Sequence, residues 1–101
     1  MRPKIVCLCG STRFKKEFEQ ATLDESLAGN IVLSVACFTH HDNIELPTDA
    51  KLELDILHFY KIDLADEVLI VNPNGYIGDS TRNEIEYAVE NKKQIRYLVQ
   101  P

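Results

Sequence analysis

Short apolar runs alternate with longer segments of helical spacing along the whole chain, and this alternation constrains the fold more than any other feature. The apolar runs, which predict strands, cover residues 4–9, 31–38, 67–72 and 94–99. The segments that predict helices cover residues 14–28, 48–65 and 80–91. Strands joined through helices form βαβ crossovers. The chain is therefore predicted to be an α/β protein with a mostly parallel sheet of four to five strands, covered on both faces.

The length of the chain, 101 residues, fits one domain spanning residues 1–101. No segment has the roughly 20 apolar residues of a membrane span, and the first residues lack the pattern of a signal peptide. We therefore expect a cytoplasmic protein without a membrane partner. The formal net charge of −5 argues against a nucleic acid polymer as partner, because such binding needs many Lys and Arg side chains. Small anionic ligands need only a local site.

The positions of the cysteines and histidines do not indicate a metal site. The chain has three cysteines, Cys7, Cys9 and Cys37. Strand alternation puts the first two on one face, where small buried thiols are common, so we interpret them as packing residues. The neighbours His40, His41 and Asp42 offer ligand types, but adjacent side chains rarely converge on one ion. We predict neither a metal nor an organic cofactor.

The tripeptide Ser-Thr-Arg occurs twice, each time between a predicted strand and a predicted helix. The first copy comes directly after a strand, in the loop of Gly10, Ser11, Thr12 and Arg13. A glycine for close backbone approach, two hydroxyls, free helix N–H groups and a guanidinium suit a phosphate or a sugar hydroxyl. The alternative is a tight turn with a Ser or Thr cap.

The second copy has carboxylates at both ends, in the stretch from Asp79 and Ser80 to Glu84. Thr81 and Glu84 have the spacing of a capping box, in which the glutamate reaches back to the backbone of the threonine. The alternative is that Glu84 faces a cleft at the carboxyl ends of the strands, where ligands bind in open α/β sheets. Thr48 is likewise the expected N-cap of the preceding helix.

Two further polar residues lie in or beside the second predicted helix. Asp66 ends that helix, where the helix dipole disfavours an anion, so it is either a solvated charge or a functional one. His58 lies among Leu57, Phe59 and Tyr60 and is interpreted as a packed or surface histidine. The aromatic residues Phe59, Tyr60 and Tyr87 are core candidates.

Taken together, three stretches resemble the nucleoside 2-deoxyribosyltransferase family, including its deoxynucleoside 5′-monophosphate N-glycosidase branch. The stretches are CGSTR after the first strand, Ala65-Asp66 before the third, and EIEYA from Glu84 to Ala88. The similarity runs in order from Ile5 to Leu98. It implies a flavodoxin-like (Rossmann-like) three-layer fold.

The resemblance also implies roles for individual residues. Glu84 matches the nucleophile that attacks the anomeric carbon, and Asp66 matches the acid near the departing base. The loop that binds the sugar or its 5′-phosphate matches Gly10, Ser11 and Arg13, and the polar loop beside the sugar matches Asp79 or Ser80. This chain departs from the family in having Glu86 for a glycine and Cys7 where several members have a tyrosine.

We therefore expect cleavage or transfer of the N-glycosidic bond of a deoxynucleoside or its 5′-monophosphate. The family completes its pockets across subunit contacts, so a homo-oligomer of two or more chains is expected. The alternative is a non-catalytic nucleotide-binding module on the same fold. A third hypothesis, a flavin-binding flavodoxin, rests on the two arginines near strand ends, and a colourless purified protein would exclude it.

Overall fold

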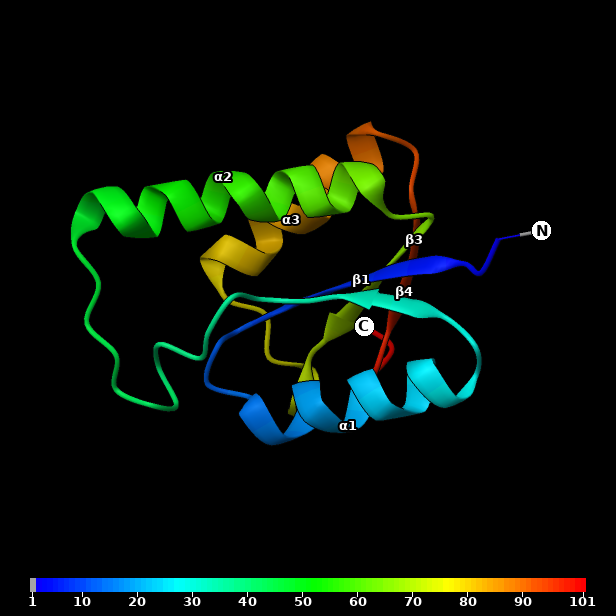
Figure 1. The fold of residues 1–101 in the computed structure, drawn as a ribbon, viewed down its shortest axis with the longest axis horizontal. Coiled ribbons are helices and arrows are strands. Elements are labelled where there is room, and N and C mark those ends of the chain that lie inside the picture. The colour runs from blue at the N-terminus through cyan, green and yellow to red at the C-terminus, as the bar shows by residue number, and fades with distance from the viewer. Residues whose placement is uncertain (1) are drawn as a thin grey trace.

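A computed structural model describes residues 2–101 as a four-stranded sheet between two layers of helix (Figure 1). The elements are β1 (Ile5–Gly10), α1 (Lys15–Leu27), β2 (Ile31–Leu33), α2 (Thr48–Leu64), β3 (Glu67–Val71), the short 3-10 helix η1 (Pro73–Gly75), α3 (Asp79–Glu90) and β4 (Gln94–Tyr97). All pairings are parallel, in the order β2-β1-β3-β4. The predicted α/β class, the four strands and the flavodoxin-like three-layer arrangement are confirmed.

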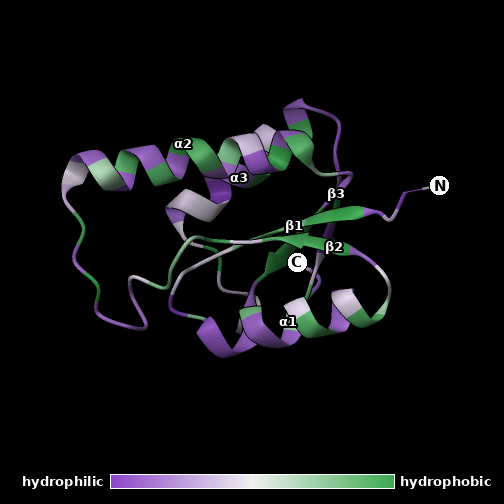
Figure 2. Cartoon of the chain, viewed as in Figure 1, coloured by the Kyte–Doolittle hydropathy of each residue, from purple (hydrophilic) through white to green (hydrophobic). Residues whose placement is uncertain are grey.

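Alternation along the central strands divides the core into two parts. Val6 and Leu8 of β1 join the cluster beneath α1, whereas Cys7 and Cys9 join the cluster beneath α2 and α3. All four side chains are fully buried. The strands are therefore apolar along most of their length, while the helices carry both apolar and polar residues (Figure 2). The prediction that Cys7 and Cys9 are buried on one face is confirmed.

The strand order reverses direction between β1 and β3, which lie side by side in the middle of the sheet. Ligands bind beyond the carboxyl ends of such a pair in open α/β sheets. Gly10 is the last residue of β1 and pairs with Val71. A Cβ at Gly10 would lie 2.5 Å from the Val71 carbonyl oxygen, so only glycine fits where the chain turns into the next loop.

Two predicted caps and one strand boundary are wrong. Thr48 is the first helical residue rather than the cap, and Pro47 precedes it without a side-chain capping bond. Helix α3 begins at Asp79 after the extended Gly78, so Thr81 lies inside the first turn and forms no capping box with Glu84. The second strand ends at Leu33 rather than residue 38, and the following residues leave the sheet.

Helix α2 exposes one row of apolar side chains. Leu52, Ile56, Tyr60 and Leu64 follow one another at i+4 spacing, and each is more than half exposed. The prediction that Tyr60 belongs to the core is therefore wrong. Phe59 and Tyr87 are partly buried and pack against the core. Within residues 2–101, none of the helices combines the length and the apolar character that crossing a membrane requires.

Candidate active site

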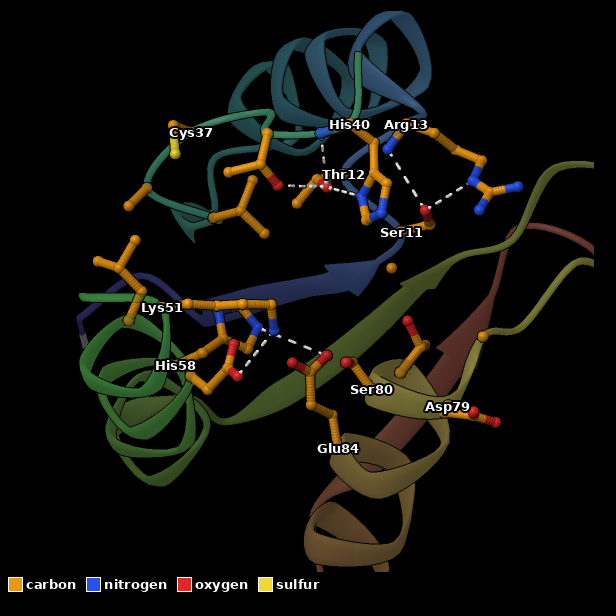
Figure 3. A pocket seen from close by; sticks show the side chains of 18 of the residues that line it. Ser11, Thr12, Arg13, Cys37, His40, Lys51, His58, Asp79, Ser80 and Glu84 are labelled. Carbon is orange, nitrogen blue, oxygen red and sulfur yellow. Dashed lines mark hydrogen bonds and ion pairs between the residues drawn. The ribbon is translucent and has the colours of Figure 1, made fainter. Parts of the chain in front are cut away.

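A cavity of about 280 Å³ opens at the carboxyl ends of β1 and β3. Four segments line it: the loop after β1, the stretch after β2, the inner side of α2 and the start of α3. Figure 3 shows the loop residues on one side of this cavity and the side chains of α2 and α3 on the other. The cavity is close to the lower end of the range for small-molecule sites, about 300–1,000 Å³.

The first Ser-Thr-Arg stretch forms one side of the cavity. The Ser11 hydroxyl accepts hydrogen bonds from the Arg13 backbone N–H at 3.3 Å and from Arg13 Nε at 3.0 Å. The Arg13 guanidinium lies 4.5 Å from the ring centre of Tyr76. Among the described residues Arg13 has no carboxylate partner, so its remaining N–H groups face solvent at the cavity mouth.

Thr12 joins the loop after β1 to the stretch after β2. Its hydroxyl lies 3.0 Å from the Thr39 hydroxyl and 2.6 Å from His40 Nδ1, and it accepts a hydrogen bond from the His40 backbone N–H. Thr12 thus holds residues 35–40 against the cavity as a wall. His40 and Asp42 belong to different contacts, because Asp42 pairs with His41 and with Lys15.

Glu84 projects from α3 into the cavity from the side opposite Arg13 (Figure 3). Its side chain is 15% exposed, and its Oε1 lies 3.9 Å from Nε2 of His58. Burial raises the pKa of Glu84 from its ordinary 4.5 to about 7, and this rise outweighs the favourable charge of His58. The negative charges of Cys7 and Asp55 act in the same direction as burial. Glu84 is therefore a carboxylate held ready to change its charge near neutral pH.

His58 forms the floor of the cavity beside Glu84. It is 5% exposed, and its Nε2 lies 3.3 Å from Cys9 Sγ and 3.8 Å from Cys7 Sγ. Burial lowers the pKa of His58, but the hydrogen bond with Cys7 and the charge of Glu84 outweigh it and raise the pKa overall. The hydrogen bond with Cys9 lowers the pKa of Cys7, while the same pairing raises that of Cys9.

Sequence reasoning placed His58 as a packed or surface histidine and missed its place in the cavity. Its partners lie 26 to 51 positions away in the chain, in β1 and α3. No local sequence pattern predicts a contact over such separations. The same is true of Asp55, which lines the cavity from α2 and pairs with Lys51 at 3.2 Å. Asp55 is thus a second carboxylate of the cavity, and the sequence did not single it out.

Asp79 and Ser80 lie at the start of α3, on the rim of the cavity. The Asp79 side chain is fully exposed, points away from the cavity and pairs with Arg82 at 3.4 Å (Figure 3). The charge of Asp79 therefore lies outside the cavity. The backbone N–H groups of Asp79 and Ser80 belong to the first turn of α3, where they have no partner within the helix. Glu86 is exposed and does not line the cavity, as expected for a residue two positions from Glu84.

Asp66 lies at the other end of the strands, directly before β3. It precedes β3, whose first residue pairs with Val6, while the cavity lies beyond Val71, about 16 Å further along the strand. Its carboxylate accepts two hydrogen bonds from Arg2 at 2.8 Å and one from the Ile5 backbone N–H at 2.9 Å. The structure therefore does not bring together Asp66 and Glu84, the two residues to which the resemblance assigns catalytic roles.

No protein-family model matches the chain, and a search of curated proteins gave no significant match. The cavity combines a buried carboxylate, a histidine beside it, a second carboxylate and, on the opposite side, a hydroxyl and a guanidinium next to a helix N-terminus. Such a set suits a ligand with an anionic or hydroxylated end and an electrophilic centre that faces Glu84.

Proposed function

We propose that this protein cleaves or transfers the N-glycosidic bond of a deoxynucleoside or its 5′-monophosphate, with Glu84 as the nucleophile. One observation carries the proposal. The one glutamate of α3 that lines the cavity is mostly buried, faces the opposite loop and has no Lys or Arg partner among the described residues. A buried carboxylate without such a partner is unfavourable for stability, which favours a functional role. The resemblance to the nucleoside 2-deoxyribosyltransferase family points to the same residue.

The reaction follows the logic of a retaining glycosidase. An oxygen of the ionised Glu84 attacks the anomeric carbon, the bond from that carbon to the base nitrogen breaks, and the base leaves with the bonding electrons and takes up a proton. The sugar remains as an ester of Glu84. Water or a second base then attacks the same carbon, gives up a proton and releases the Glu84 carboxylate.

His58 and Asp55 support the two halves of this reaction. His58 stabilises the charge of Glu84, and its place against the thiols of β1 fixes the direction of its ring. Asp55 takes the part that the resemblance gives to Asp66, because it is a cavity carboxylate able to hydrogen-bond the departing base. Ser80 and the α3 N-terminus lie beside the sugar.

The loop of Gly10, Ser11, Thr12 and Arg13 binds the 5′ end of the substrate. Gly10 lets the end of β1 lie close against Val71 where the chain turns into this loop, and the Ser11 hydroxyl and Arg13 guanidinium offer a charge-assisted site for a phosphate. The loop precedes α1, whose N-terminal N–H groups favour an anion. The substrates are small molecules of the cytoplasm, and the reaction requires neither a metal nor an organic cofactor.

The protein acts as a homo-oligomer. The row of Leu52, Ile56, Tyr60 and Leu64 on α2 supports this part of the proposal, because a continuous exposed apolar stripe is typical of a subunit contact. The row lies on the outer side of the helix whose inner side lines the cavity. Sedimentation that finds only an 11.5 kDa species at micromolar concentration would contradict it.

The test is release of free base from a panel of nucleosides and 5′-monophosphates, followed by chromatography. We expect Glu84→Gln to lose base release by at least about a hundredfold, equivalent to roughly 2.7 kcal/mol of transition-state stabilisation. Glu86→Gln is the matched control, since Glu86 is an exposed acid on the same helix, and it should keep full activity. Turnover retained by Glu84→Gln would exclude the nucleophile assignment. No turnover by the native protein on any substrate would favour the nucleotide-binding module.

A further inference from the structure

Three potential metal ligands meet at the floor of the cavity, and the Glu84 carboxylate lies beside one of them. Cys7 Sγ, Cys9 Sγ and His58 Nε2 all lie within 4.8 Å of one another, and all three residues are buried. The Glu84 carboxylate lies 3.9 Å from the same Nε2. These side chains come from three elements, β1, α2 and α3, and Figure 3 shows His58 and Glu84 facing each other in the cavity.

Hydrogen bonding alone does not account for this arrangement well. Both thiols and the carboxylate approach one ring nitrogen, Nε2 of His58, at 3.3, 3.8 and 3.9 Å. A ring nitrogen carries at most one proton or one lone pair, so it can serve one of these partners well at a time. A nucleophilic triad does not fit either, because a triad places the thiol and the carboxylate on opposite nitrogens of the ring.

The distances agree better with ligands around a common centre. Zinc binds thiolate sulfur at about 2.3 Å and imidazole nitrogen at about 2.0–2.1 Å in a tetrahedron, which puts a sulfur and a nitrogen about 3.5 Å apart. The two observed distances from Nε2 to sulfur, 3.3 and 3.8 Å, lie on either side of that value. Two soft thiolates and an imidazole favour Zn²⁺ over Mg²⁺ or Ca²⁺, which prefer oxygen ligands.

We propose that the chain binds one Zn²⁺ ion through Cys7, Cys9 and His58, with the Glu84 carboxylate as the fourth ligand. The ion reaches the site through the cavity, which His58 and Glu84 line. With four protein ligands the site is closed, and it leaves no position for an activated water. The bound ion therefore withdraws Glu84 from the cavity instead of supplying chemistry to it.

This site does not depend on the proposed glycosidase reaction, because metal binding is measured without any nucleoside. If the proposed function also holds, Zn²⁺ and substrate compete for Glu84, and Zn²⁺ inhibits base release. If the chain is only a binding module, the metal site is unaffected.

The experiment is a titration of the metal-free protein with Co²⁺ alone, in a non-thiol reductant, followed by absorption spectroscopy. We expect one Co²⁺ per chain, with a thiolate charge-transfer band and the visible bands of tetrahedral cobalt, and displacement of both by Zn²⁺. Cys7→Ser and Cys9→Ser should each weaken the charge-transfer band and lower Co²⁺ affinity by at least about tenfold. Cys37→Ser is the control, because Cys37 lies outside the cluster, and it should bind like the native chain.

The metal-free variants should be compared first by circular dichroism, and Glu84→Gln serves as a variant that leaves the packed thiols intact. It should keep the charge-transfer band and bind Co²⁺ more weakly. A native chain without a charge-transfer band at stoichiometric Co²⁺ would overturn the proposal. Bands that survive unchanged in both cysteine variants, or that vanish in Cys37→Ser, would place the metal elsewhere and overturn it equally.

Discussion

The pKa values of the carboxylates at the two ends of the sheet are shifted in opposite directions. At the amino end, Asp66 and Arg2 pair at 2.8 Å, and this pairing with Arg2, helped by the Ile5 N–H, lowers the pKa of Asp66 to about 2. At the carboxyl end, Glu84 and Arg13 lie on opposite sides of a cavity, and burial raises the pKa of Glu84 to about 7. The first two groups pair with each other, whereas Glu84 and Arg13 lie apart across the cavity.

The difference teaches how a structural carboxylate is told from a functional one. Asp66 is 38% exposed and gains from its charge, so ionisation supports the fold. Glu84 is mostly buried beside apolar and thiol groups, so ionisation opposes the fold. Carboxylates with a pKa raised in this way are concentrated at functional sites, which is why we propose a role for Glu84 and none for Asp66.

Glu84→Gln should stabilise the protein at alkaline pH. The pKa of Glu84 is raised in the folded state, so its favourable contribution is complete below pH 4.5 and is lost as the pH rises through about 7. The variant stays neutral, and we expect its free energy of unfolding to exceed that of the native chain by about 2–3 kcal/mol at pH 8 and to match it at pH 4. Urea unfolding at both pH values measures this. Equal stability at pH 8 would show that Glu84 is not held in an unfavourable site.

Arg13→Ala should weaken binding of 5′-monophosphates more than binding of nucleosides. Within residues 2–101 the Arg13 guanidinium has no carboxylate partner, and a hydrogen bond to a charged phosphate is worth roughly 1.5–3 kcal/mol. Calorimetric titration of each ligand class measures the difference. Arg82→Ala is the matched control from the second Ser-Thr-Arg stretch, where the arginine pairs with Asp79 outside the cavity. Equal losses for both ligand classes would remove the phosphate assignment.

Asp66→Asn should leave base release unchanged and lower the melting temperature slightly at pH 7. The pKa of Asp66 is lowered in the folded state, so its contribution is present above pH 3.8 and is lost as the pH falls through about 2. The effect is small because water screens an exposed ion pair. The melting curves of the native chain and the variant should differ at pH 7 and should converge near pH 2. A large loss of base release in Asp66→Asn would show that Asp66 takes part in the reaction.

The sequence predicted the fold almost completely, because the alternation of apolar runs and helical segments depends on local patterns. It also offered a cleft position for Glu84 as the alternative to a capping box, since the start of a helix that follows a strand lies at the carboxyl end of the sheet. By the same rule Asp66, which comes directly before its strand, lies at the amino end of the sheet. Only the resemblance assigned Asp66 to the same site as Glu84. The capping box failed because α3 begins two residues before Thr81.

The partners of Glu84 could not be predicted in this way. Asp55 and His58 reach the cavity because α2 packs across the carboxyl half of the sheet, and that packing depends on the whole tertiary structure. Cys7 and Cys9 were correctly placed as buried thiols, but their distance from His58 became visible only in the folded chain. Long-range contacts of this kind leave no periodic signal in the sequence.

The central claim is that Glu84 attacks the anomeric carbon, and the covalent intermediate tests it most directly. The native chain should be mixed with a deoxynucleoside that it cleaves, quenched in acid, digested and analysed by mass spectrometry. We expect a deoxyribosyl ester on the peptide that contains Glu84, and none in Glu84→Gln. Base release without any adduct, or an adduct on another residue, would contradict the assignment of Glu84 as the nucleophile.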